Sequence, residues 1–228
     1  MLFTAEFGRN SFRGNALRKL IIWGASGHGK VVLEIARATG LFSGIVFVDD
    51  SCSSPGGCFS GCELLPASEG FETLKASGHC LVVAIGNNRD RERCFQEGID
   101  RGLDLVALIH PAAIVSASAR IGGGTVVMPR VVVNADAVIG HNCILNTGAI
   151  VEHDCRIGDH VHLAPGVILG GGVTVEAYSL LGIGTIALPG TRIGAGAVVG
   201  AGAVVLDSVP PGATSVGVPA KVLSKICR

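Results

Sequence analysis

Two different folds are predicted along the 228-residue chain: an α/β unit with a parallel sheet, followed by an all-β solenoid. Three observations predict this order. A glycine-rich turn follows a short aliphatic run near residue 20, and aliphatic residues recur at every sixth position from residue 109 onward. Glycine contributes 34 residues while aromatic residues make up only 4%, so the core must be built from aliphatic side chains, which is typical of a repeat.

Residues 1–18 are predicted to be a flexible N-terminal extension. They carry basic side chains but no apolar run long enough for a signal peptide or a membrane span, so we expect a cytoplasmic protein without membrane insertion. The chain holds 18 basic and 18 acidic residues, and this balance argues against the basic surface that nucleic-acid binding requires.

Residues 19–108 are predicted to form the α/β unit. A buried strand over residues 20–23 runs into Gly-Ala-Ser-Gly-His-Gly, and a helical pattern covers residues 30–39. A glycine turn between a strand and a helix can hold a phosphate at the helix N-terminus. Ser26 stands where the dinucleotide fingerprint has its second glycine, which weakens an NAD interpretation and favours one nucleotide in a half-sized, Rossmann-like βαβαβ unit.

The next two predicted strands also end in polar residues. A strand over residues 45–48 ends at Asp49 and Asp50, where a carboxylate can accept a hydrogen bond from a ribose or sugar hydroxyl. A third strand over residues 81–85 ends at Gly86 and precedes a second helix.

Eight cysteines in a chain without an export signal are expected to be reduced thiols. Cys52, Cys58 and Cys62 lie close together, but a zinc site would need tighter pairs and a fourth ligand. We therefore expect no metal, and the role of this loop stays open.

Residues 109–228 are predicted to form the solenoid with a C-terminal cap. Every sixth residue over seventeen hexads is aliphatic: Ile109, Val115, Ile121, Val127, Val133, Ile139, Leu145, Val151, Ile157, Leu163, Leu169, Val175, Leu181, Ala187, Ile193, Val199 and Val205. The residue four places after each of these is small or β-branched, so Cys143 and Cys155 are expected to fill the core. This period predicts short parallel strands stacked into a triangular prism.

Glycine at the second place of many hexads is expected to supply unusual backbone angles at the corners of the prism: Gly122, Gly140, Gly158, Gly182, Gly194 and Gly200. The segment after Val209 is expected to close the prism, with a short terminal helix as one possibility.

Ile-Gly-x-x-x-x repeats that end in Gly-Val-Pro-Ala-Lys at residues 217–221 resemble the hexapeptide-repeat acyltransferases, which fold as left-handed parallel β-helices. The resemblance implies the left hand, a homotrimer, and acetyl-CoA in the groove between neighbouring prisms. General crossover rules alone would favour the opposite hand.

With the glycine turn, Val-Asp-Asp at 48–50 and Ala-Ile-Gly-Asn-Asn at 84–88, the chain resembles bacterial sugar-nucleotide acetyltransferases of the sialic acid and bacillosamine pathways. The resemblance runs from about residue 20 to the C-terminus. It implies N-acetylation of a 4-amino-4,6-dideoxy sugar linked to a nucleotide, with UDP as the expected nucleotide. Its implied acceptor contacts are Ser26, Gly27, His28, Asp49, Asp50 and Gly86.

Acetyl transfer to an amine needs a base, and histidine suits neutral pH. His153 occupies the third place of a hexad and points outward beside Asp154, although residues alone leave an ordinary surface histidine equally open. The family motif Glu-His-[Asp/Glu]-Cys matches residues 152–155 and implies that His153 is the base. The resemblance also implies acetyl-CoA contacts at His162 and at the backbones of Ile183 and Ala201.

Three alternatives remain open. O-acetylation of a sialic acid or another sugar hydroxyl could use the same base. A zinc hydratase like the gamma carbonic anhydrases shares the prism, but its His-x4-His spacing differs from the spacing of His153, His160 and His162. A non-catalytic or NAD-linked protein could also use these folds, because fold alone does not fix function.

Overall fold

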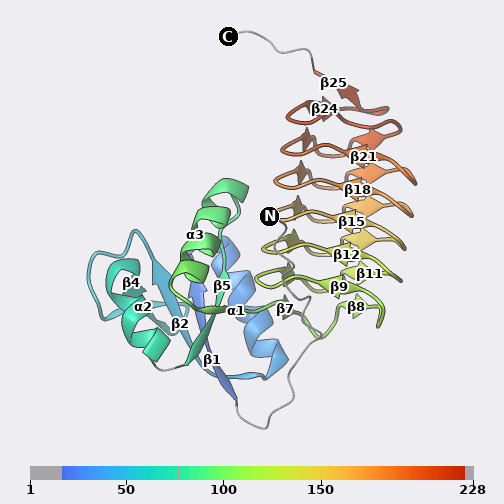
Figure 1. The fold of residues 1–228 in the computed structure, drawn as a ribbon. Coiled ribbons are helices and arrows are strands. Elements are labelled where there is room, and N and C mark those ends of the chain that lie inside the picture. Colours follow the sequence, from blue (N-terminus) through green and yellow to red (C-terminus); the bar gives the residue numbers. More distant parts are fainter. Residues whose placement is uncertain (1–16, 77, 224–228) are drawn as a thin grey trace.

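The computed structural model describes residues 17–76 and 78–223 and shows two parts side by side (Figure 1). Most of the expected extension over residues 1–18 lies outside these ranges. Arg18 was included in that extension, but the structure places it in the first strand. None of the helices within these ranges is long and apolar enough to cross a membrane.

The N-terminal part is a six-stranded sheet in the order β3-β4-β2-β1-β5-β6, parallel except for the β3–β4 hairpin. Its strands are β1 (Arg18–Trp23), β2 (Phe42–Asp49), β3 (Gly57–Phe59), β4 (Cys62–Pro66), β5 (His79–Val83) and β6 (Asp104–Leu105). Its helices are α1 (Gly27–Thr39), α2 (Ala67–Ala76) and α3 (Asn88–Asp100). The parallel α/β unit is therefore confirmed, whereas β3, β4, α2 and β6 had not been predicted.

Two boundaries next to the predicted turns differ from the sequence prediction. Helix α1 begins at Gly27 rather than at Lys30, because Ser26 caps it and accepts a hydrogen bond from the Gly29 N–H. Strand β5 ends at Val83 instead of continuing to Ile85, so the turn that leads to α3 is longer than expected.

The C-terminal part is a triangular prism (Figure 1). Each of its three faces is a stack of short strands that run parallel to one another. Face A holds β7 (Leu108–Ile109), β10 (Val126–Val127), β13 (Ile144–Leu145), β16 (His162–Leu163), β19 (Leu180–Leu181) and β22 (Val198–Val199). Face B holds β8 (Ile114–Val115), β11 (Val132–Val133), β14 (Ile150–Val151), β17 (Ile168–Leu169), β20 (Ile186–Ala187) and β23 (Val204–Val205). Face C holds β9 (Arg120–Ile121), β12 (Val138–Ile139), β15 (Arg156–Ile157), β18 (Thr174–Val175) and β21 (Arg192–Ile193).

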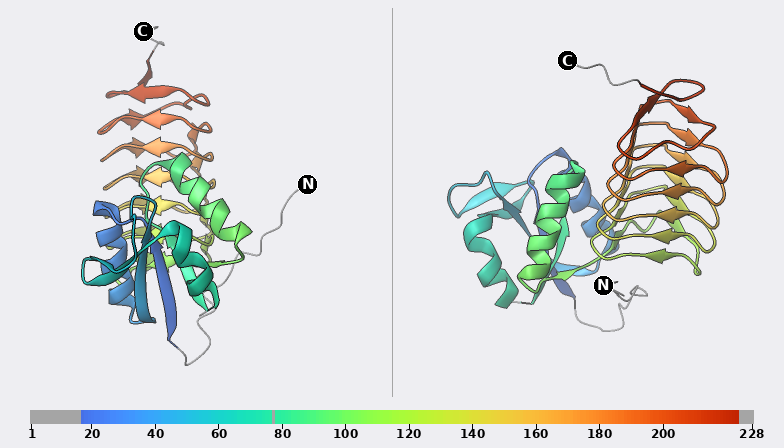
Figure 2. Two further views of the ribbon diagram at one scale, coloured as in Figure 1. Left: turned by 90° about the vertical axis from the view of Figure 1, so that its left-hand side faces the viewer. Right: turned by 45° about the horizontal axis from the view of Figure 1, so that its top comes forward.

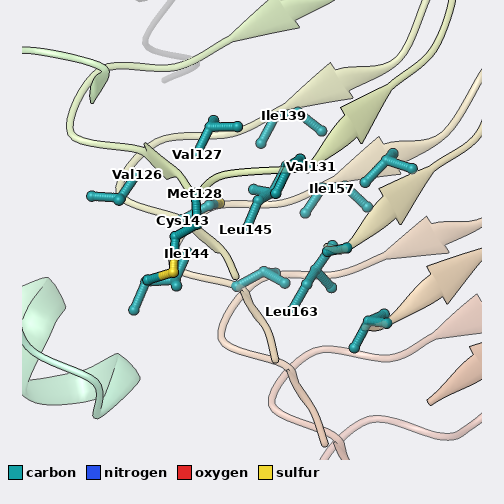
Figure 3. Packing of buried hydrophobic residues seen from close by; sticks show 14 of the residues in the cluster. Val126, Val127, Met128, Val131, Ile139, Cys143, Ile144, Leu145, Ile157 and Leu163 are labelled. Atoms are coloured by element: carbon teal, nitrogen blue, oxygen red, sulfur yellow. The ribbon is translucent and has the colours of Figure 1, made fainter. Parts of the chain in front are cut away.

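The second residue of each of these strands is the repeating aliphatic residue, and it points into the core (Figure 3). Leu145, Val151, Leu163 and Leu169 have no exposed surface. Cys143 and Cys155 are buried as well, which confirms them as core residues. Eighteen residues, or three hexads, make one turn of the prism, so residue i lies beside residue i+18.

Glycines at the second place of the hexads have a different purpose from the one predicted. The prediction that they supply unusual backbone angles is wrong for Gly122, Gly140, Gly158, Gly182, Gly194 and Gly200, none of which has a positive φ. A Cβ on Gly182 would lie 2.6 Å from the backbone N of Ala201, and one on Gly158 equally close to the N of Ala177. These glycines allow one turn of the prism to pack directly on the next.

Positive φ angles occur instead at the fourth place of the hexad. Gly148, Gly166 and Gly184 have φ of 68–69°. Several fourth-place residues are not glycine and adopt the same angles at a cost in conformational energy: Arg130, Asp136, Asn142, Asp154, His160 and Tyr178.

The C-terminal cap is built from strands. Strand β24 (Thr214–Val216) extends face A, and β25 (Lys221–Val222) pairs with it in the antiparallel direction. The suggested terminal helix is thus wrong for residues up to 223, and residues 224–228 lie outside the described ranges.

The α/β part lies beside the first turns of the prism, with α3 next to the corner that leads from face C to face A, here called corner CA (Figure 2). The other two corners are named in the same way: corner AB follows face A and corner BC follows face B. This placement separates the expected site residues into groups.

Candidate active site

His153 lies on corner BC, directly after β14, and its side chain is 63% exposed. The next residue, Asp154, has a φ of 61°. This left-handed angle turns the carboxylate back toward the preceding residue, so that its Oδ2 lies 2.8 Å from His153 Nδ1. The neighbours that would point to opposite faces of a regular strand therefore meet at the corner.

The Asp154 carboxylate determines the chemistry of this imidazole. Its hydrogen bond raises the pKa of His153 above the ordinary value of 6.5. Because Nδ1 faces the carboxylate, it carries the proton in the neutral ring, and Nε2 is the basic nitrogen. An exposed imidazole held in this tautomer can remove a proton from a nucleophile.

Gly171 lies one turn of the prism after His153 on the same corner and leaves room for the imidazole ring. A Cβ added to Gly171 would lie 2.6 Å from both Cε1 and Nε2 of His153. The φ of Gly171 is not positive, unlike that of Gly172, so its backbone would accept a side chain. Its lack of a side chain therefore matters for the placement of the ring.

The glycine turn is fixed by Asp49 at the end of β2. Its Oδ2 accepts a 2.6 Å hydrogen bond from the Ala25 N–H, and its Oδ1 accepts bonds from the N–H and hydroxyl of Ser51. These hydrogen bonds lower the pKa of Asp49 against the opposing effect of burial, which is the largest influence on the group. In this structure Asp49 shapes the turn that carries Ser26 and Gly27.

Asp50 is also engaged within the chain. Its Oδ1 accepts a hydrogen bond from Trp23 Nε1, and its Oδ2 lies 3.0 Å from Arg93 Nη2. The sequence prediction assigned both Asp49 and Asp50 to substrate, and the structure shows that each already has protein partners.

His28 and His162 come together although they lie far apart in the sequence. His28 lies in the first turn of α1, directly after the glycine turn, and His162 projects from β16 on face A. Burial is the main cause that lowers the pKa of each to about 4, and the charge of Arg91 lowers both further. The nearby His162 lowers the pKa of His28 as well. Both rings are therefore neutral at pH 7.

The surroundings of the two rings are polar. His162 makes a hydrogen bond with the backbone of Gly86, and its Nε2 lies 3.3 Å from Asn146 Nδ2. The Nε2 of His28 is buried and has no hydrogen-bond partner within the described residues. The glycine turn, the Gly86 turn and face A thus meet in one cluster with an unused hydrogen-bonding atom.

Ile183 and Ala201 lie one turn apart on corner AB, and the Gly202 N–H donates to the Ile183 carbonyl over 2.8 Å. The Ile183 side chain is 62% exposed. Within one chain the expected residues therefore form three groups: His28, His162 and Gly86 between the two parts, Ile183 and Ala201 on corner AB, and His153 on corner BC.

Sequence reasoning missed three residues of these groups: Gly171, Asn146 and Arg91. Gly171 stands at the third place of its hexad, which is otherwise glycine only at Gly123, and that contrast was visible in the sequence. Asn146 and Arg91 carried no comparable signal, because their importance comes from contacts with distant segments.

The two cysteines inside the prism, Cys143 and Cys155, are buried and poorly ionised. Burial raises the pKa of the thiols of Cys143, to about 12, and of Cys155. Among residues 17–76 and 78–223 no three His, Cys, Asp or Glu side chains are grouped as metal ligands would be.

Two family profiles match the chain: the PglD N-terminal domain over residues 19–97 and the bacterial transferase hexapeptide of six repeats over residues 136–171. A UDP-N-acetylbacillosamine N-acetyltransferase from Bacillus subtilis is 39% identical over 117 residues. That alignment spans 49% of this chain and about half, 52%, of the relative.

Solved structures match over nearly the whole length. A mutant perosamine N-acetyltransferase from Caulobacter crescentus, in complex with CoA and GDP-perosamine, is 40% identical with a TM-score of 0.85, covering 92% of this chain and 99% of its own. The acetyltransferase domain of PglB from Neisseria gonorrhoeae, in complex with acetyl coenzyme A, is 40% identical with a TM-score of 0.86, covering 91% and 100%.

These likenesses confirm the fold class, an α/β domain followed by a left-handed parallel β-helix. They also confirm the resemblance seen in the sequence. The chain belongs to the bacterial sugar-nucleotide N-acetyltransferases of the hexapeptide-repeat family, which are acyltransferases that use acetyl-CoA.

Proposed function

We propose that the protein transfers the acetyl group of acetyl-CoA to the 4-amino group of a nucleotide-linked 4-amino-4,6-dideoxy sugar, with UDP as the nucleotide. The observation that carries this proposal is the His153 imidazole, which is exposed on a prism corner and held by Asp154 through Nδ1, so that Nε2 is left as the basic nitrogen. Support for the substrate class comes from the relatives, which are N-acetyltransferases of nucleotide-linked amino sugars.

The reaction is a direct transfer. The sugar amine attacks the thioester carbonyl, His153 Nε2 takes the proton that the amine loses as the C–N bond forms, and the C–S bond breaks to release CoA as the thiol. Asp154 stabilises the imidazolium that results. The buried thiols of Cys143 and Cys155 take no part.

We assign the acceptor to the α/β unit over residues 19–108. Ser26 and Gly27 start helix α1, whose N-terminus favours a phosphate group. The unpartnered Nε2 of His28 offers a hydrogen bond to a sugar nucleotide that enters beside Gly86. The carboxylates of Asp49 and Asp50 border the same turn and retain free lone pairs for hydroxyl groups.

We assign acetyl-CoA to the prism over residues 109–228. Corner AB offers it the exposed apolar side chain of Ile183 and the backbone near Ala201. Glycines such as Gly184 and Gly202 leave open space on this corner, because an added Cβ would meet nothing within 4 Å. His162, on face A next to this corner, completes the proposed contacts.

We further propose that the active form is a homotrimer, because face B carries an apolar stripe. The outward residue of each strand on this face is aliphatic: Ile114, Val132, Ile150, Ile168, Ile186 and Val204. The corresponding residues of face C include Arg120, Arg156 and Arg192. If three prisms turn face B toward a common axis, corner BC of each meets corner AB of the next. His153 of one subunit then faces the proposed acetyl-CoA contacts of its neighbour.

The sedimentation velocity of the Ile168→Glu variant tests this assembly. The wild-type protein is expected to sediment at three times the chain mass of 23.2 kDa. The variant is expected to sediment as a smaller species and to lose acetylation, because the site is then incomplete. A fully active monomer would contradict the assembly.

The substrate class is tested by thiol release from acetyl-CoA with a panel of acceptors. UDP-, GDP- and dTDP-linked 4-amino-4,6-dideoxy sugars are compared with their 4-hydroxyl analogues. We expect turnover with the amines and the highest kcat/KM with the UDP-linked sugar. Turnover with the hydroxyl analogues alone would make the protein an O-acetyltransferase and would overturn the proposal.

A further inference from the structure

Helix α3 carries one buried arginine, Arg91, whose side chain reaches between the two parts of the molecule and is 1% exposed. All five of its N–H donors have acceptors. Nε donates to Asn142 O over 2.9 Å, Nη1 to Ile85 O and Gly86 O over 3.1 Å each, and Nη2 to Asn88 Oδ1 and His160 O over 2.8 Å each.

These acceptors belong to two different regions. Ile85 and Gly86 lie in the turn between β5 and α3, and Asn88 is the first residue of α3; this segment borders the proposed acceptor site. The carbonyls of Asn142 and His160 lie one turn apart on corner CA of the prism. One planar guanidinium therefore joins the turn to two successive turns of the prism. A lysine has three donors on a single atom and cannot reproduce this arrangement.

Corner CA itself is adapted to the helix. Asn142, His160 and Tyr178 stand one above another with positive φ angles, each at a cost of about 1 kcal/mol or more. Their side chains make contacts in return. Asn142 Nδ2 donates to the Arg91 carbonyl, the Tyr178 hydroxyl donates to Glu92 over 2.6 Å, and the rings of His160 and Tyr178 stack at 5.1 Å.

The turn has two further attachments to the prism. Asn88 Nδ2 donates to the carbonyls of Tyr178 and Ser179 over 2.9 and 3.1 Å, and His162 makes its hydrogen bond with the Gly86 backbone. The position of the turn is thus determined by the prism as well as by the sheet from which it emerges.

We infer that Arg91 is a positioning residue that fixes the Gly86 turn, and with it the bound acceptor, relative to the acetyl-CoA site on the prism. This inference rests on the proposed function for the statement that the acceptor binds beside Gly86. Displacing a bound reactant by about 1 Å can cost 10²-fold in rate, so a fixed attachment between the two binding regions has direct kinetic value.

The test is Arg91→Lys, which keeps the charge and removes the five-donor arrangement. We expect kcat/KM for the amino-sugar acceptor to fall roughly 10- to 10²-fold. The Kd of acetyl-CoA should stay within about twofold, because the hydrogen bonds of Arg91 to the prism lie on corner CA and not on corner AB. Amide hydrogen exchange at residues 86–88 should accelerate. Wild-type kcat/KM together with wild-type exchange in this variant would overturn the inference.

Two further variants keep the test decisive. If Arg91→Lys does not fold, Asn88→Ala removes one acceptor of Arg91 and the bond to the Tyr178 carbonyl, and we expect a smaller loss in the same direction. Gln96→Ala, on the exposed side of the same helix, serves as the control and should match the wild type. If the wild type acetylates no nucleotide-linked amino sugar, the proposed function fails. The rate of amide hydrogen exchange at residues 86–88 in Arg91→Lys then still tests whether Arg91 fixes the Gly86 turn.

Discussion

Corners BC and CA of the prism follow the same six-residue repeat but differ in what their strained residues contact. On corner CA, Asn142, His160 and Tyr178 have positive φ angles, and each contacts α3 or a residue that does. On corner BC, Asp154 has the same kind of angle, but its side chain makes one hydrogen bond, to His153, with both side chains more than 60% exposed.

The difference separates residues that stabilise the fold from residues that serve chemistry. Partly buried contacts with α3 offset the conformational cost on corner CA. An exposed ion pair contributes little to stability, so the Asp154–His153 contact does not recover the cost of its backbone. A strained residue whose only contact is an exposed and titratable side chain indicates function.

Among variants that keep the His153 side chain, the largest effect on catalysis is expected from Gly171→Ala. The added methyl group would collide with the His153 ring and displace its Nε2, so kcat should fall by roughly 10²-fold while the melting temperature stays unchanged. Ala117→Ser, at the same hexad place three turns away on corner BC, is the control. A Gly171→Ala enzyme with wild-type kcat would show that the ring is not held against this glycine.

The second prediction is a pH dependence of stability caused by the neutral histidines between the two parts. With folded-state pKa values near 4 and an ordinary value of 6.5, His28 and His162 bind protons more readily in the unfolded chain. Stability should therefore be fully present above pH 6.5 and decline as the pH falls toward 4, by roughly 1–2 kcal/mol per histidine at pH 5. Urea unfolding at a series of pH values should show a shallower decline for His162→Gln than for the wild type, and an equal decline would contradict this role of His162.

On corner BC, Asp154→Asn should lower the catalytic rate moderately. The amide cannot stabilise the imidazolium, so we expect kcat to fall by about tenfold. The pH profile gives the more specific result. Because Asp154 raises the pKa of His153, the wild-type rate should rise with pH through a midpoint above 6.5, and this midpoint should move down in the variant. An unchanged midpoint would exclude His153 as the titrating base.

The smallest effect is expected from Tyr178→Phe on corner CA. Loss of the hydroxyl that donates to Glu92 should lower the free energy of unfolding by about 1 kcal/mol, while the ring continues to stack on His160. Chemical denaturation with an unchanged m-value measures this. A larger loss of acetyl-CoA affinity than of stability would contradict the structural role of this corner.

The prism could be predicted from sequence because every hexad contains the same pattern of one aliphatic and one small inward residue. The aliphatic residue of each hexad gave the register of all seventeen strands, and the small inward positions identified Cys143 and Cys155 as core. The reason for the second-place glycines could not be read in the same way, because it depends on the distance between successive turns. The strands of the cap had no repeat to reveal them.

The site was predictable only where its residues are neighbours in sequence. His153 and Asp154 are adjacent, and their contact followed from the corner once its backbone angle was known. The cluster of His28 and His162 joins segments far apart in the chain, and the five acceptors of Arg91 come from three segments. Such contacts depend on how the two parts dock, which no local pattern records.

The role of His153 is tested most directly by a paired measurement on His153→Gln: steady-state thiol release with a nucleotide-linked 4-amino sugar, and thermal unfolding of the same preparation. We expect kcat to fall by roughly 10²- to 10⁴-fold while the melting temperature equals that of the wild type, since the ring serves chemistry and not the fold. Full activity of this variant, or a loss of activity that follows a loss of stability, would contradict the assignment of corner BC as the catalytic corner.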